Sequence, residues 1–165
     1  MKLSTKVEKA LNDQINLELN SAYAYLGMAA YFAQTPFAGF ARWMHLQSRE
    51  ELGHAQKFFD YLVDRGGKVS LQALAQPASA YQAPIDAFRA SLQHEQKVSA
   101  AIERIYELAL SEKDYSTMSF LKWFLDEQVE EEKSVSDMLA RLELVGDNTS
   151  GLYQVDQYAG RRGES

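Results

Sequence analysis

Cysteine is absent from this 165-residue sequence, which excludes disulfides, iron–sulfur clusters and thiolate metal sites. Long apolar runs are also missing, since none approaches the roughly 20 residues that a membrane-spanning helix needs. Basic residues number 17 against 23 acidic ones, and a net charge of −6 without a basic patch argues against a nucleic-acid partner. Residues 1–14 lack the apolar centre of a secretory signal, so we expect a cytoplasmic location.

The residues that are present suit a single globular domain over positions 1–165. Hydrophobic residues make up 46% and charged residues 24% of the chain, which is long enough to bury a substantial core. Apolar residues recur every three to four positions, and this spacing predicts an all-α fold. The expected helices cover residues 4–34, 36–65, 84–113, 116–145 and 151–159, and residues 160–165 are expected to form a frayed tail.

The connections between these helices predict a four-helix bundle with one long crossover. The first two helices and the last two long ones are joined by short links, so each pair should be antiparallel. Thr35 is expected to cap the second helix, with Pro36 as its first residue. The link 66–83 could span about 60 Å when extended, enough to return along the bundle and make the second and third helices parallel. Leu71 and Leu74 are expected to hold this link against the surface.

Four glutamates lie near the middle of the four long helices, on the apolar stripe of each: Glu18, Glu51, Glu95 and Glu131. A midpoint lies at the same depth whichever way its helix runs, so the four carboxylates should meet in one layer. Acidic side chains rarely enter a core unless they are paired or bind a metal. No lysine or arginine holds a central position on these stripes, and unpaired buried carboxylates would repel one another. The layer therefore predicts a site for a multivalent cation.

The residue types in this layer indicate which metal it would hold. His54 follows Glu51 by one helical turn and adds an imidazole to the same face. One nitrogen among several oxygens suits iron or manganese better than calcium. Five protein ligands are more than one ion needs, but they match two ions bridged by a carboxylate, for which Glu51 is the expected residue.

Four other aromatic or imidazole side chains are candidates for a place near this site. Tyr25 lies two turns after Glu18, so its phenol should approach the metal layer, although an ordinary core tyrosine would fit the same position. Trp123 is expected to pack in the core. His45 and His94 miss the central stripes and are expected to lie on the surface without binding metal.

The sequence around these residues resembles bacterial non-haem ferritins, of the ferritin-like di-iron family, over essentially its full length. The matching stretches are residues 16–19, 48–54, 94–96 and 126–133. In the symmetric form of the di-iron bundle, two helices carry a Glu-x-x-His motif. Here the last long helix has Glu127 and Glu130 at that spacing in place of a second histidine, a departure that resembles ferritins rather than bacterioferritin.

The resemblance implies iron storage by a homo-oligomer of about twenty-four subunits, with Fe²⁺ oxidised by O₂ or H₂O₂ and kept as a ferric mineral inside a hollow cage. It places one iron of a ferroxidase centre on Glu18, Glu51 and His54. It places the second on Glu51, Glu95 and Glu131, with the amide of Gln128 nearby. A possible third iron falls on Glu50, Glu127, Glu130 and Glu131, and Tyr25 would donate an electron to oxygen intermediates.

Related di-iron proteins differ from this sequence at identifiable points. Bacterioferritin would bind haem through a methionine right after Glu51, and Leu52 stands there, so no haem is expected. A rubrerythrin-type peroxidase would carry a cysteine-rich iron domain, and a mini-ferritin would lack this complete set within one bundle. A haem-free bacterioferritin-like protein or another di-iron oxidase of the same fold is the alternative reading. In the short helix, Leu152, Val155 and Ala159 are expected to bury against another subunit.

Overall fold

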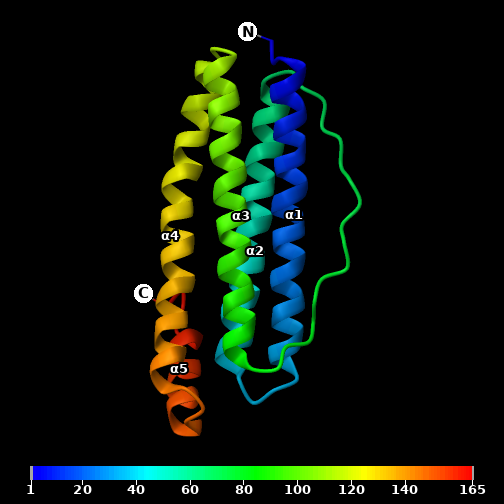
Figure 1. Ribbon diagram of the computed structural model, residues 1–165. Helices are drawn as coiled ribbons and strands as arrows, with labels where there is room; N and C mark the ends of the chain where they lie inside the picture. The colour runs from blue at the N-terminus through cyan, green and yellow to red at the C-terminus, as the bar shows by residue number, and fades with distance from the viewer. Residues whose placement is uncertain (1, 165) are drawn as a thin grey trace.

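The computed structural model describes residues 2–164, and within that range it contains helices and no strands (Figure 1). The predicted all-α fold is therefore confirmed. The helices are α1 (Thr5–Ala33), α2 (Ala38–Asp64), α3 (Pro84–Ser111), α4 (Tyr115–Val145) and α5 (Thr149–Gly160). Within the described range, none of them combines the length and the apolar character needed to cross a membrane.

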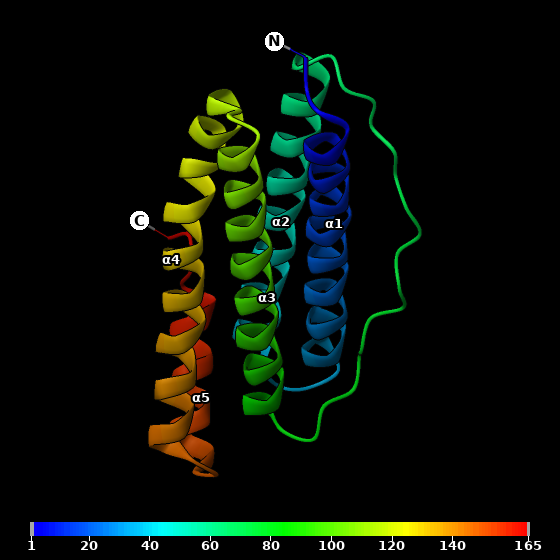
Figure 2. The same cartoon turned by 45° about the horizontal axis from the view of Figure 1, so that its top comes forward.

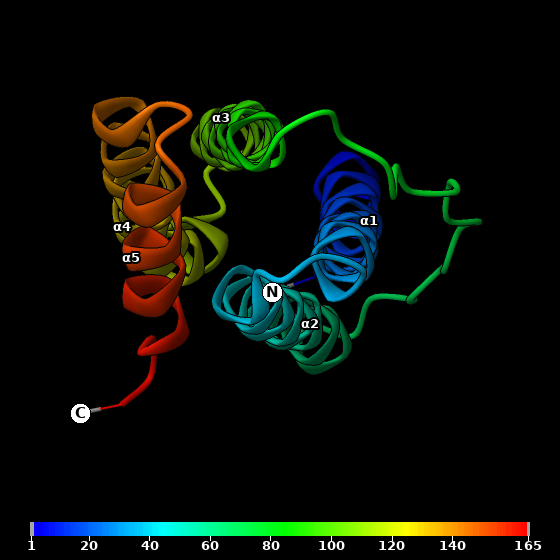
Figure 3. The ribbon, with the colours of Figure 1, turned by 90° about the horizontal axis from the view of Figure 1, so that it is seen from below.

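The four long helices form a bundle with one long crossover, as the connections predicted. In Figure 1, α1 and α4 run downward whereas α2 and α3 run upward, so α2 and α3 are parallel. The link between them passes along the outside of α1 over its whole length (Figure 2). From below, the α1–α2 pair lies opposite the α3–α4 pair, and α5 packs against α4 and α2 (Figure 3).

The link after α2 is held by hydrogen bonds rather than by its leucines. Leu71 and Leu74 are 64% and 39% exposed, so the prediction that they hold the link to the surface is wrong. The side chain of Asn12 does this instead: it donates to the carbonyl of Lys68 at 2.9 Å and accepts from the amide of Ser70 at 2.7 Å. Asn12 on α1 thus provides hydrogen-bond partners for two backbone groups of the extended link, which has no regular secondary structure to pair them.

Helix α2 begins at Ala38 rather than at Pro36. Thr35 is the reason, because its hydroxyl donates to the carbonyl of Phe32 at 2.7 Å and accepts from the amide of Phe37 at 3.2 Å. These bonds fix a turn between the two helices. Thr35 therefore stabilises the turn instead of acting as the residue that caps α2.

The cap of α2 comes from α5. The amide of Phe40 donates to Oδ1 of Asp156 at 2.8 Å, and Asp156 is only 1% exposed. A Cβ atom at Gly39 would lie 1.8 Å from the carbonyl oxygen of Asp156, so only glycine permits this approach. Val155 and Ala159 are buried in the chain's own core, and the expectation that their stripe awaits another subunit is wrong.

The segment after α5 is also ordered against the bundle, contrary to the predicted fraying. Arg162 lies over the ring of Trp43 at 4.4 Å and pairs with Glu50 at 2.7 Å. Ser165, the last residue of the predicted tail, lies outside the described residues.

Two apolar clusters fill the bundle, one on each side of its middle. The cluster at the α5 end is rich in aromatic and sulfur-containing side chains, among them Tyr25, Phe32, Phe40, Met44 and Phe88. The cluster at the other end includes Leu11, Ile15, Phe58, Ile102 and Phe124. Buried polar side chains occupy the layer between the two clusters.

Candidate metal centre

The layer between the two apolar clusters brings the predicted acids together. Glu18 from α1, Glu51 from α2, Glu95 from α3 and Glu131 from α4 are 0%, 1%, 0% and 4% exposed. His54, one turn after Glu51, is buried among them at 5% exposure. Charges at this depth are stable only when they are neutralised or bind an ion.

Their ligand atoms form three overlapping groups, in each of which the atoms lie within 4.8 Å of one another. The groups are Glu18–Glu51–His54, Glu51–Glu95–Glu131 and His54–Glu127–Glu131. Glu51 belongs to the first and second groups, and Glu131 to the second and third. A shared carboxylate has two oxygens and can therefore bridge two adjacent ions.

Two glutamines that sequence reasoning missed orient these acids. Gln14 donates from Nε2 to Oε1 of Glu18 at 2.8 Å. Gln47 donates from Nε2 to Oε1 of Glu51 at 2.8 Å and to Oε2 of Glu131 at 2.7 Å. Each glutamine precedes its glutamate by four residues, the spacing that places two side chains on one face of a helix. That spacing is the signal that could have identified both.

One oxygen in the layer has no hydrogen-bond partner among the described residues. Oε2 of Glu18 is buried and unbonded, and it lies 3.9 Å from Nδ1 of His54. Nδ1 of His54 is closer to Oε2 of Glu51, at 3.2 Å. An unsatisfied buried acceptor beside an imidazole and a second carboxylate fits the position of a cation's ligand.

The α3 side of the layer is built around Glu95. The phenol of Tyr25 donates to Oε1 of Glu95, and Gln128 donates to its Oε2 at 3.3 Å. Burial, followed by the charges of Glu95 and Glu51, raises the pKa of Tyr25 well above its ordinary value. Tyr25 therefore stays protonated near neutral pH and reaches the layer as a hydrogen-bond donor.

Burial acts to raise the pKa of every acid in the layer, but the net shift differs among them. It raises the pKa of Glu18 well above the ordinary value, of Glu95 to about 8 and of Glu131 to about 7, with the charge of Glu51 as the next cause in each case. Burial also acts to raise the pKa of Glu51, but the hydrogen bond and charge of His54, together with the hydrogen bond from Gln47, outweigh it and lower that pKa. Burial acts to lower the pKa of His54, but the hydrogen bond and charge of Glu51 outweigh it and raise the pKa of the imidazole. Protons therefore neutralise most of the layer unless a cation displaces them.

The four residues expected to hold a third iron are not gathered in one group. Glu127 and Glu131 join His54. Glu50 and Glu130 are exposed and belong to none of the three groups that the described residues form. Oε2 of Glu50 accepts a hydrogen bond from Arg162 at 2.7 Å.

Two other predictions for side chains near the layer are corrected by the structure. His94 is partly buried rather than on the surface, because it hydrogen-bonds to Ser21 and its ring meets the ring of Tyr25 edge-on. Trp123 is 40% exposed rather than in the core; its ring stands edge-on to His54, 5.6 Å between centroids. His45 is exposed, as predicted.

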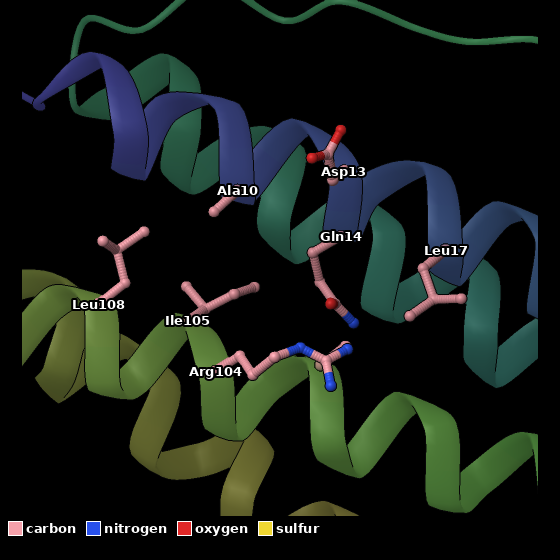
Figure 4. Close-up of a pocket in the computed structure, with 8 residues that line it drawn as sticks. Ala10, Asp13, Gln14, Leu17, Arg104, Ile105 and Leu108 are labelled. Atoms are coloured by element: carbon pink, nitrogen blue, oxygen red, sulfur yellow. The ribbon is translucent and has the colours of Figure 1, made fainter.

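A recess between α1 and α3 lies beside the layer of buried acids (Figure 4). It has a volume of about 340 Å³, and Gln14 and Arg104 lie across it from each other. Gln14 is the side chain that donates to Glu18. The recess therefore ends one side chain away from the buried carboxylates.

Comparison with known proteins gives consistent matches. A family model described as a ferritin-like domain matches residues 8–145. The bacterial non-heme ferritin of Staphylococcus aureus (strain USA300) is 39% identical over 160 residues, covering 97% of this chain and 96% of that protein. The open pore ferritin of the hyperthermophilic archaeon Archaeoglobus fulgidus superposes with a TM-score of 0.96 at 43% identity, covering 97% of this chain and 98% of that one. A closed form of the same archaeal ferritin, engineered by site-directed mutagenesis, gives 0.95 at 43% identity and covers 98% of both chains.

Proposed function

This chain belongs to the ferritin family, whose members store iron, and on that premise we propose that it oxidises Fe²⁺ at the buried carboxylate layer and stores the ferric product in a hollow cage. The layer acts as a ferroxidase centre, with O₂ or H₂O₂ as the oxidant. The observation that carries the proposal is the overlap of the ligand groups, because Glu51 can serve two ions at once.

Each residue of the centre has a distinct role in this proposal. Glu18, Glu51 and His54 bind one Fe²⁺, and Glu51, Glu95 and Glu131 bind the other. The two ions give up one electron each to the oxidant, so both must be held close together when it arrives. Carboxylates stabilise the higher charge of Fe³⁺ better than neutral ligands would, which favours oxidation at this site.

The side chains around the ligands keep them in position. Gln128 holds Glu95 from α4, and Tyr25 holds it from α1. Tyr25 can also supply an electron to oxygen intermediates, because its phenol contacts a ligand directly. The proposal keeps a third iron site on Glu50, Glu127, Glu130 and Glu131, of which Glu127 and Glu131 already share a ligand group. No haem is part of the proposal, since an exposed leucine follows Glu51 at the position of the haem methionine.

The proposed assembly is a cage of about twenty-four identical subunits in the cytoplasm. The similar structures include both an open pore ferritin and an engineered closed form of it. This supports a multi-subunit assembly. Sedimentation or light scattering of the purified protein measures the particle size directly. A monomer or dimer in iron-free buffer would contradict the cage.

The ferroxidase activity is tested by removing ligands one at a time. Glu51→Ala and His54→Ala should each slow the initial aerobic oxidation of Fe²⁺ by roughly ten- to a thousandfold, because each removes a side chain that serves the paired ions. His45→Ala is the matched control, since His45 is an exposed histidine on the same helix. Oxidation is followed by the absorbance of the ferric product, and helical content by circular dichroism. Rates equal to the control's in both ligand variants would refute the site.

A further inference from the structure

The segment that follows α5 brings one arginine, Arg162, to the edge of the metal layer. Nη2 of Arg162 donates to Oε1 of Gln47 at 2.7 Å and to Oε2 of Glu50 at 2.7 Å. Nη1 donates to the carbonyl of Trp43 at 3.4 Å, and the guanidinium lies over the Trp43 ring. Only 19% of this side chain is exposed, so its position is fixed on several sides.

The contact with Gln47 determines which end of that amide faces the carboxylates. An amide group has an oxygen and a nitrogen of similar size, and its orientation is set by its hydrogen-bond partners. Arginine has donors and no acceptor, so it must face the oxygen. The nitrogen of Gln47 is thereby directed to Glu51 and Glu131, to which it donates at 2.8 and 2.7 Å.

We propose that Arg162 is a positioning residue for the metal centre: it fixes the amide of Gln47, which in turn holds Glu51 and Glu131 in the arrangement that receives the paired ions. This inference rests on the proposed ferroxidase centre and extends its machinery to the segment after α5. Gln47 is fully buried, and its neighbours in the layer are acceptors. If Arg162 were lost, the oxygen of Gln47 would lose its charged donor, and the amide that donates to Glu51 and Glu131 would be held less firmly.

A charged neighbour provides a matched control for this role. Arg161 is exposed and adjacent in sequence, so its removal takes away the same charge without touching Gln47. Lysine at position 162 tests geometry rather than charge, because an ammonium group is a compact point charge and lacks the planar fork of a guanidinium. Gln47→Met keeps the length of the side chain and removes its amide.

The experiment is a titration of the assembled, metal-free protein with Co²⁺, read by the visible absorption of the bound ion and by calorimetry. Arg162→Ala should weaken binding at the paired sites about tenfold and change the absorption spectrum, at the lower end of the effects seen when partners of metal ligands are lost. Arg161→Ala should bind like the wild type. Arg162→Lys should lie between the wild type and Arg162→Ala.

A double variant tests whether the effect passes through Gln47. Gln47→Met should also weaken Co²⁺ binding, and adding Arg162→Ala to it should produce no further loss, because the amide that the arginine orients is already gone. Losses that multiply in the double variant would overturn the inference. So would an affinity and spectrum of Arg162→Ala that match those of Arg161→Ala.

Two further outcomes have a fixed meaning. If Arg162→Ala does not assemble, Arg162→Lys decides: weaker Co²⁺ binding with an altered spectrum supports the positioning role, and wild-type behaviour contradicts it. If the wild type and Glu51→Ala bind Co²⁺ identically, the ferroxidase centre itself is wrong, and this inference fails with it. The second result is distinguishable because it appears without any change at position 162.

Discussion

Metal binding to this bundle should release protons, and it should release more of them at neutral pH than at alkaline pH. Burial and the charge of Glu51 raise the pKa of Glu95 to about 8 and that of Glu131 to about 7, so both are largely or partly protonated at neutral pH in the metal-free protein. A cation binds the ionised carboxylates, and each ligand must therefore lose its proton first. Lowering the pH should weaken metal binding.

The size of the release follows from the two pKa values. At about pH 7, Glu95 is mostly protonated and Glu131 about half, so the pair should release roughly one to two protons per chain when both are bound. At about pH 9 the same pair should release only about 0.1 proton, because both acids are already ionised. Glu18, whose pKa is also raised well above the ordinary value, adds to the release.

The assay uses Zn²⁺, which binds without redox chemistry, in weakly buffered solution with a pH-stat or an indicator dye. Glu95→Gln is the informative variant, because glutamine copies the shape of the protonated acid and has no proton to release. At saturating Zn²⁺ near neutral pH, it should release roughly one proton fewer per chain than the wild type. A release that is the same at both pH values, or the same in the variant, would show that these acids are ionised before metal arrives.

Two further predictions concern stability and the order of iron oxidation. Replacing Asp156 by alanine removes the hydrogen bond to the amide of Phe40 and should lower the free energy of unfolding by about 1–2 kcal/mol, whereas the exposed Asp147→Ala should have little effect. Thermal unfolding followed by circular dichroism compares the two, and equal melting temperatures would mean that α2 does not depend on this cap. Glu130→Ala should leave the initial rate of Fe²⁺ oxidation close to that of the wild type but change the amount of iron oxidised per O₂ in later turnovers. Loss of the fast phase in that variant would place Glu130 in the paired-ion centre.

The features that could be predicted from the sequence are those that depend on the spacing of residues along one helix or on the length of a link. Apolar spacing predicted the helices, and the length of the link 66–83 predicted the parallel pair α2 and α3. The convergence of four mid-helix acids followed from geometry alone, since a bundle aligns the midpoints of helices of similar length. Helical periodicity was therefore enough to predict the architecture of the bundle and the depth of the candidate site within it.

The features that escaped prediction depend on contacts between distant parts of the chain. The cap of α2 comes from Asp156, 116 residues beyond Phe40, and nothing in the local sequence at Pro36 indicates it. His94 is sequestered by a serine on another helix, which a stripe drawn on α3 cannot show. Leu71 and Leu74 are exposed, and the link is held instead by hydrogen bonds with Asn12 on α1.

The long-range bonds from the region of α5 have a consequence for how the protein is made on the ribosome. The Asp156–Phe40 bond spans 116 residues and the Arg162–Gln47 bond spans 115, so neither can form until the later residue has been synthesised and has left the exit tunnel. Throughout that interval the nascent chain already displays α1 and α2, with Glu18, Glu51 and His54 among their residues. Its α2 lacks the cap and the arginine that hold the finished arrangement. Iron chemistry at this site is therefore expected to begin only after α5 has docked.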